Sequence, residues 1–209
     1  MKINILVLLI ITQIIFSSNN HIIQELQNST DWKLTSELSG GEKVYRKSIS
    51  GKDLDAFRIT KLVTISPSLI FDIVEDIDQY SEILVSSRID SKIINKTTEY
   101  IDGYNYIYID SYFFSDREYK FRMSRNENGI VWYLLESNGI NNKAIYLNNG
   151  AGLWSYVDSD GMYEISYSLY MDIGGKIPKF LDNKLNYHGI LNVFKDVINY
   201  SQGNLQIQK

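Results

Sequence analysis

The C-terminal part of this chain constrains the fold most, because a strand pattern runs there through two glycines into a long helix pattern. Over residues 162–172 apolar and polar side chains alternate, as they do along a strand with one buried face. Gly174 and Gly175 interrupt this pattern, and Pro178 stands where the first turn of a helix tolerates proline. The alternation predicts that one face of the strand carries Tyr163, Ile165, Tyr167, Leu169 and Met171.

The helix that follows carries a broad apolar stripe. Between about residues 177 and 201 the stripe recurs at helical spacing and consists of Leu181, Leu185, His188, Leu191, Phe194, Val197 and Ile198. Because the stripe is broad, we expect this helix to pack against a wide apolar surface and not against a single neighbouring helix or strand. A long antiparallel sheet that grips one C-terminal helix has the shape of a container, and this shape is the starting point for a functional interpretation.

Strand patterns also dominate the rest of the chain. We expect them over residues 32–38, 44–49, 57–65, 88–95, 99–112, 117–125, 130–136 and 153–158. Ser66 and Pro67 begin a helix that ends near Asp78, and a short turn follows through Tyr80 and Ile83. Residues 137–152 are rich in Asn and Gly and are expected to loop out. This order predicts one α+β domain over residues 32–203, after a segment 19–31 and before a tail 204–209.

The N-terminus resembles an export signal. Lys2 precedes a mostly apolar run over residues 3–16, and Ser17 and Ser18 follow. The run is shorter than the roughly 20 apolar residues that a membrane span needs. The chain contains no Cys, which excludes disulfides and a Cys-linked lipid anchor. We therefore predict a signal peptide over residues 1–18 and an exported, periplasmic or secreted protein, with an uncleaved membrane anchor as the alternative.

Composition excludes several classes of function. The net charge is −4 and no basic stripe is present, which argues against a nucleic-acid partner. With two His and no Cys, a His-based zinc site or a Cys-His nucleophile is nearly excluded, and no G-x-S-x-G motif occurs. The 16 Tyr, eight Phe and three Trp suit strands and the walls of an apolar ligand cavity. We expect a monomer that uses no cofactor and no metal.

Four segments in order resemble the START (steroidogenic acute regulatory protein-related lipid transfer) domain family, and together they extend over about residues 32 to 201. Two of them are WKL at 32–34 followed by GEKVYR at 41–46, and DIDQY at 76–80. More specific are SDREY at 115–119, which resembles the family's S-D-R-D-F strand start, and GGKIPKFLDN at 174–183. The latter resembles the G-G-x-I-P-x-W-L-x-N entry to the family's lid helix. Tyr112, Phe113 and Phe114 stand where the family usually has prolines.

The resemblance implies a helix-grip fold, in which a curved antiparallel sheet wraps around the long C-terminal helix. It further implies a non-enzymatic binder of one lipid or other apolar molecule, which is held between sheet and helix. Periodicity predicts that the ligand cavity is lined by Arg117, Tyr119, Phe121, Met123, Tyr163, Ile165, Tyr167 and Leu169, under a roof of Leu181, Leu185 and His188.

Two aromatic residues between strong strands are the predicted gate. Phe113 and Phe114 cannot both point inward on a strand, so at least one is a candidate for contact with a membrane or a ligand. In the alternative, both pack under the helix. The resemblance implies that this loop and the helix move to admit the ligand.

Arg117 and His188 each allow two interpretations. Arg117 leads an apolar strand face, so its charge must be paired or must meet a polar ligand group. Asp110, Glu99 and Asp116 are its candidate partners in an ion pair. His188 on the helix stripe is expected to be a hydrogen-bonded wall residue, and a catalytic role is the alternative.

Three functions compete at this stage. The first is an exported protein that binds or transfers a lipid, with transient membrane contact. The second is an enzyme of the polyketide cyclase or aromatase type, whose architecture is similar and in which Arg117, Tyr119 and His188 would act on a ketone. The third is a coenzyme Q-binding START-like protein, which residues 74–94 resemble.

Overall fold

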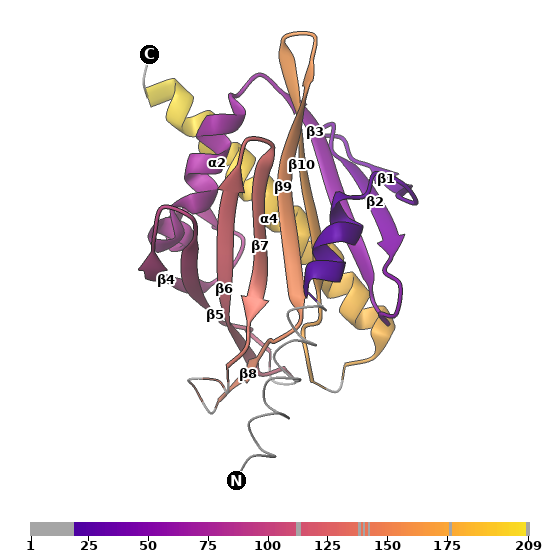
Figure 1. Ribbon diagram of the computed structural model, residues 1–209, viewed down its shortest axis with the longest axis vertical. Helices are drawn as coiled ribbons and strands as arrows, with labels where there is room; N and C mark the ends of the chain where they lie inside the picture. Colours follow the sequence, from indigo (N-terminus) through magenta and orange to yellow (C-terminus); the bar gives the residue numbers. More distant parts are fainter. Residues whose placement is uncertain are drawn as a thin grey trace.

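One curved sheet wraps around a single long helix (Figure 1). The computed structural model describes residues 19–111, 114–137, 139, 141, 143–175 and 177–207, with side chains up to residue 204. The sheet has the strand order β1-β2-β3-β10-β9-β7-β6-β5-β4, in which all neighbours are antiparallel, and the short β8 pairs parallel with β6. The strands are β1 (Lys33–Glu37), β2 (Lys43–Ser48), β3 (Asp55–Val63), β4 (Ile89–Lys96), β5 (Ile101–Ile107), β6 (Asp116–Asn126), β7 (Gly129–Leu135), β8 (Ala144–Tyr146), β9 (Gly150–Ser159) and β10 (Met162–Met171).

Helices cover both sides of this sheet. A helix over residues 19–27 lies on the outer side, and the long α4 (Lys179–Ile207) crosses the inner side (Figure 1). Between β3 and β4 the chain forms α2 (Pro67–Glu75), a 3-10 helix (Ile77–Gln79) and α3 (Tyr80–Ile83). The predicted α+β helix-grip architecture is thereby confirmed. No helix among the described residues combines the length and the apolar character that a membrane span requires.

Part of the segment that the Asn- and Gly-rich sequence predicts as a loop forms strands instead. Ala144–Tyr146 form β8, and β9 begins at Gly150 rather than at residue 153. The strand expected over residues 99–112 ends instead at Ile107. It ends there because the Asp116 carboxylate accepts a hydrogen bond from the backbone N–H of Ile109 at 2.8 Å, which turns the chain out of the sheet.

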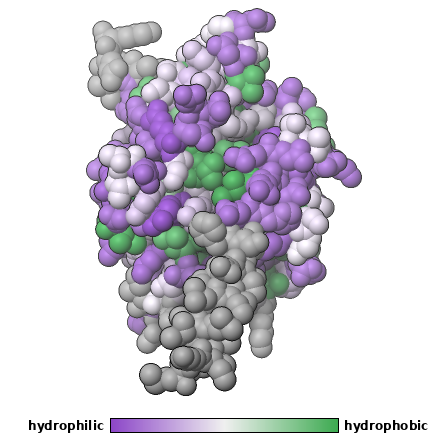
Figure 2. Space-filling model, in the orientation of Figure 1, coloured by the Kyte–Doolittle hydropathy of each residue, from purple (hydrophilic) through white to green (hydrophobic). Residues whose placement is uncertain are grey.

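Hydrophobic residues pack on both faces of the sheet, as strand alternation requires. The inner face, α2 and α4 share the main core, whose largest fully buried side chains include Trp154 and Phe194. On the outer face a smaller cluster joins Ile22 and Leu26 of the N-terminal helix to residues of β3, β9 and β10. Figure 2 views this outer side, which is mostly hydrophilic with a small apolar area near its centre.

Two cations fix the C-terminal end of the helix over residues 19–27. Lys47 Nζ donates to the Glu25 carbonyl at 2.8 Å, and Arg58 Nη2 donates to the Leu26 carbonyl at 2.6 Å. The last carbonyls of a helix carry partial negative charge, so cations stabilise this end. The Arg58 guanidinium also stacks on the Trp32 ring, 4.2 Å from its centroid. This small cluster holds the N-terminal helix on the sheet.

A glycine turn directs α4 back across the sheet. Gly174 and Gly175 have φ values of +66° and +84°, which side chains with a Cβ rarely adopt. The helix then packs against β10 and β9 through aromatic rings: Trp154 stacks between Tyr167 at 4.3 Å and Phe194 of α4 at 5.8 Å. This stack joins two strands to the helix and forms the centre of the core.

Truncation of Phe194 should therefore cost far more stability than truncation of Leu185 on the opposite side of α4. Phe194 is fully buried, whereas Leu185 is 40% exposed. We expect Phe194→Ala to lower the free energy of unfolding by about 3–5 kcal/mol and Leu185→Ala by roughly 0.5 kcal/mol or less. Urea denaturation of both variants measures this difference, and equal losses would mean that α4 presents its other face to the sheet.

Candidate functional site

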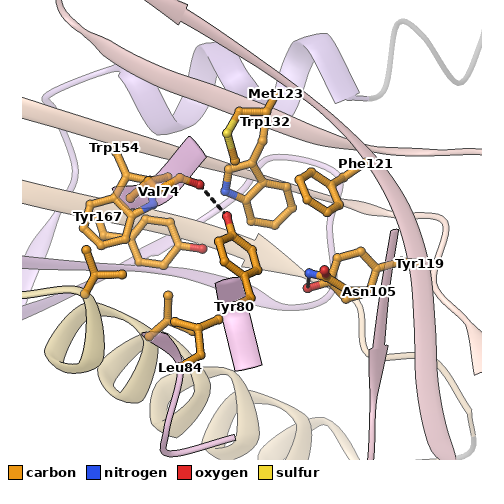
Figure 3. A pocket seen from close by; sticks show the side chains of 12 residues that line it. Val74, Tyr80, Leu84, Asn105, Tyr119, Phe121, Met123, Trp132, Trp154 and Tyr167 are labelled. Atoms are coloured by element: carbon orange, nitrogen blue, oxygen red, sulfur yellow. Dashed lines mark hydrogen bonds between the residues drawn. The ribbon is translucent and has the colours of Figure 1, made fainter. Parts of the chain in front are cut away.

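An apolar pocket lies between the inner face of the sheet and α4 (Figure 3). The strands β5, β6, β7, β9 and β10 contribute one wall, and the helical segments contribute the other. The lining residues are Val74, Tyr80, Leu84, Asn105, Tyr119, Phe121, Met123, Trp132, Trp154, Tyr167, Val193 and Val197. None of these side chains carries a charge at neutral pH.

The pocket is small in this conformation. Its volume is about 70 Å³, whereas an engineered apolar cavity of roughly 150 Å³ binds benzene. Drug-sized ligands occupy pockets of about 300–1,000 Å³. A lipid therefore enters only if α4 or the neighbouring loops move and the aromatic side chains repack.

Glycine on β9 allows one wall to form. Gly152 lies directly opposite Trp132 on β7, and a Cβ at Gly152 would stand 2.3 Å from the indole nitrogen of Trp132. The indole of Trp132 therefore occupies the space that a side chain at position 152 would fill, and in this position it lines the pocket. Any larger residue at position 152 would push Trp132 out of this place.

Polar atoms cluster at one part of the pocket. Asn105 Nδ2 donates to the Tyr119 hydroxyl at 2.9 Å, and Asn105 Oδ1 is buried without a hydrogen-bond partner among the described residues. The Tyr80 hydroxyl is already used, because it donates to the Val74 carbonyl at 2.6 Å (Figure 3). Burial raises the pKa of the Tyr119 and Tyr167 phenols above the ordinary value, so both remain neutral.

Several residues predicted from strand alternation lie in the inner core. Tyr119, Phe121, Met123 and Tyr167 line the pocket, whereas Ile165 and Leu169 are buried in the core beside it. Tyr163 is half-buried and packs edge-on against Tyr156 at 6.0 Å. A role of these side chains in binding a ligand stays a prediction.

The predicted roof of the pocket is wrong. Leu185 is 40% exposed, His188 is exposed against the edge of Tyr187, and Leu181 is half-buried. In its N-terminal half the inward face of α4 carries Asp182, Asn186 and Ile190 instead, whereas Phe194, Val197 and Ile198 are buried as the predicted stripe requires.

The first two turns of α4 bury polar side chains because these complete the end of β10. Asn186 Nδ2 donates to the Met171 carbonyl at 2.7 Å and to Asp182 Oδ1 at 3.1 Å. Burial raises the pKa of Asp182 to about 6, with the charge of Asp172 contributing, while the Arg117 charge opposes the rise.

Arg117 does not lie in the pocket and forms no ion pair with a described carboxylate. Its Nε donates to the Ile173 carbonyl at 2.6 Å, and its other nitrogens donate to the carbonyls of Ser115 and Gly174. Both earlier interpretations of this residue, an ion pair and a head-group contact, are thus replaced by a third. Arg117 ties the connection before β6 to the connection between β10 and α4.

The predicted gate is only partly described. Phe113 lies outside the described residues, and Phe114 is half-buried in a bend before β6. The predicted signal peptide at residues 1–18 also lies outside them. Among the side chains that are described, no group of His, Cys, Asp or Glu could hold a metal ion.

Sequence reasoning missed more than half of the pocket lining. Trp132, Trp154 and Asn105 belong to predicted strands, and their alternation places them on the inner face. The alternation of β5 contains the signal for Asn105, which is the one amide on the inward side of that strand. Val74, Tyr80 and Leu84 come from the helical segments after β3, which approach the pocket only through tertiary packing.

A search of protein-family models finds no match to this sequence, and a search of curated proteins finds none either. Solved structures do match. A fragment of the STAR-related lipid transfer protein from Xanthomonas axonopodis superposes with a TM-score of 0.72 at 16% identity, over 82% of this chain and 99% of that one. Human StAR-related lipid transfer protein 5 gives 0.70 at 11% identity, over 95% and 98%.

The chain has the helix-grip fold of START domains. A structure from another functional class is also similar: the Zhui aromatase/cyclase from Streptomyces gives a TM-score of 0.52 at 12% identity, over 72% of this chain and 93% of that one. At these identities the similarity establishes the START-like fold and not a ligand.

The raised pKa of Asp182 predicts a pH-dependent stability. Between the ordinary pKa of 3.8 and about 6, the folded protein retains a proton that the unfolded chain releases, so the wild type loses stability as the pH rises through this range. Asp182→Asn cannot ionise and should lack this loss, so that its melting temperature exceeds that of the wild type above pH 6.

Thermal melts between pH 4 and 7.5 measure how the melting temperature changes with pH in the wild type and in Asp182→Asn. Asp158→Asn, which changes an exposed carboxylate on β9, serves as the control and should keep the slope of the wild type. Parallel curves for the wild type and Asp182→Asn would contradict the raised pKa.

Proposed function

We propose that this protein binds a lipid or another apolar small molecule between the sheet and α4 and carries it across an aqueous space. The observation that carries the proposal is the uncharged, aromatic pocket on the inner face of the START-like sheet. The START-like structures it resembles include STAR-related lipid transfer proteins. A pocket with few polar groups and no charged lining residue suits an apolar ligand.

The small pocket volume requires an opening, and we place it at the first turns of α4, which precede the lining residues Val193 and Val197. The inward side of these turns is polar, whereas Phe180 and Leu185 on the outward side are 76% and 40% exposed. Separation of these turns from the sheet would cost little apolar contact. We infer that they move together with the loop that carries Phe113 and Phe114, and that exposed aromatic side chains contact a membrane while cargo is loaded.

The position of residue 19 is compatible with an exported or membrane-anchored chain. Asn19 Nδ2 donates to the carbonyl of Leu134, near the end of β7, at 3.0 Å. That end of the sheet also contains the connections before β6 and after β10, which Arg117 joins. A retained N-terminal anchor would therefore hold the proposed opening toward a membrane.

The enzymatic alternative has less support. Of the three residues that it requires, only Tyr119 lines the pocket, because Arg117 binds loop carbonyls and His188 is exposed. The similarity to an aromatase/cyclase is also the weaker one, with a TM-score of 0.52 against 0.72. A quinone remains one of the apolar ligands that the pocket would suit.

Mass spectrometry of the gently purified protein should detect an adduct of lipid size, and extraction should identify it as a phospholipid, a sterol-like lipid or a quinone. Val193→Trp should abolish the adduct, because a large ring at this half-buried position fills the pocket from α4. Val157→Trp is the matched control on the outer face, where residue 157 is 62% exposed. A wild-type protein that is always empty and takes up no fluorescent lipid would refute the proposed function.

Loss of the aromatic side chains at the proposed opening should slow transfer without weakening binding. We expect Phe180→Ser, and separately the pair Phe113→Ser and Phe114→Ser, to lower the rate of lipid transfer between vesicles several-fold at unchanged equilibrium binding. Val85→Ser removes another exposed apolar side chain, 74% exposed, and should transfer at the rate of the wild type. Reduced binding at an unchanged rate would instead make these phenylalanines part of the pocket wall.

A further inference from the structure

We propose that the pocket selects neutral ligands that carry a hydroxyl group, which binds between Asn105 and Tyr119. This inference rests on the proposed function, since it names the chemistry of the ligand that the same pocket takes. Asn105 and Tyr119 are directly opposite residues on β5 and β6, and both line the pocket. They form a polar position in a mostly apolar wall (Figure 3).

The Asn105 side chain has an unused acceptor in this position. The residue is 3% exposed, and no hydrogen bond from a described residue reaches its Oδ1. A buried amide oxygen without a partner is unfavourable, because it has lost water and gained nothing in exchange. The arrangement is therefore completed by a hydrogen-bond donor that enters from the pocket.

Tyr119 supplies the complementary donor. Its oxygen accepts a hydrogen bond from Asn105 Nδ2 at 2.9 Å, so its own hydrogen can point elsewhere. A ligand hydroxyl would donate to the amide oxygen and accept from the phenol. Because a hydroxyl both donates and accepts, it satisfies the pair in either orientation of the amide.

The other polar groups of the wall do not offer such a position. The Tyr80 hydroxyl donates to the Val74 carbonyl, and the indole of Trp132 carries only a donor. Among the described lining residues, only Asn105 has a buried side-chain acceptor without a hydrogen-bond partner. The hydroxyl of a ligand has its best-matched position at Asn105.

The same wall disfavours an ionised head group. None of the described lining residues is charged, and the cation on the same strand as Tyr119, Arg117, donates to four backbone carbonyls. Transfer of a carboxylate or phosphate into this pocket would leave the charge without a partner, which is strongly unfavourable. A fully apolar ligand would enter, but it would leave the Asn105 oxygen unpaired.

Three probes with the same chain length separate these cases: decan-1-ol, its isomer 1-methoxynonane and decanoate at pH 8. Binding to the full-length protein is followed by tryptophan fluorescence, because Trp132 and Trp154 line the pocket. The ether accepts a hydrogen bond from Tyr119 but donates none to Asn105. We expect the alcohol to bind at least about tenfold more tightly than the ether, which corresponds to about 1.4 kcal/mol, and decanoate to bind more weakly than both.

Variants assign this preference to the two residues. Asn105→Leu should bring the ratio of the alcohol and ether affinities close to one while the ether still binds, and Tyr119→Phe should reduce the ratio partly. Tyr156→Phe removes a hydroxyl from the same face of the sheet outside the pocket and should keep the ratio of the wild type.

The outcomes separate this inference from the proposed function. Equal affinities of alcohol and ether in the wild type, or an unchanged ratio in both Asn105→Leu and Tyr119→Phe, would overturn the hydroxyl preference while leaving the pocket a ligand site. Tightest binding of decanoate would overturn it in favour of an anionic ligand. If no probe binds and no lipid co-purifies, the proposed function fails and the preference fails with it.

Discussion

The stack of Trp154 between Tyr167 and Phe194 is the interaction on which the rest of the structure depends. It joins β9, β10 and α4, and its rings approach to 4.3 and 5.8 Å. A sheet with an apolar inner face is unstable unless something covers that face. Because α4 crosses the inner side, it both completes the core and closes the pocket. If the proposed function holds, the same helix controls both folding and ligand access.

The architecture was predictable from the sequence because each strand needs only alternation along its own length. The alternation over residues 162–172 places Tyr167 on the inner face, and the structure agrees. The inward face of α4 followed from helical spacing at Phe194 and Val197 but not in the first turns, which expose Leu185 and bury Asp182 and Asn186. Those polar residues are inside to bind the end of β10, which is a tertiary requirement. Helical periodicity alone cannot reveal such an exchange.

The same limit applies to the pocket. Its strand residues follow from alternation, but Val74, Tyr80 and Leu84 come from helical segments whose position depends on tertiary packing against the sheet. For Arg117, strand alternation predicted the position on the inner face correctly, but the sequence did not reveal its hydrogen-bond partners. Its guanidinium binds carbonyls of two connections that lie far apart in the sequence. A charge on an apolar strand face required partners, and the backbone supplied them.

A pocket of about 70 Å³ inside a container fold has a consequence for ligand exchange. The aromatic side chains fill space that a lipid would occupy, so the empty protein keeps its core packed instead of exposing an apolar void. A ligand that enters then replaces contacts among the aromatic side chains by contacts with itself. The free-energy difference between the ligand-free and the ligand-bound protein therefore stays small. The polar inward side of the first turns of α4 lowers the cost of that exchange further, because few apolar contacts are lost there on opening. Repacking of apolar side chains cannot supply a hydrogen bond to the unpaired oxygen of Asn105 in the described pocket. Under these conditions that oxygen is the group that discriminates among ligands.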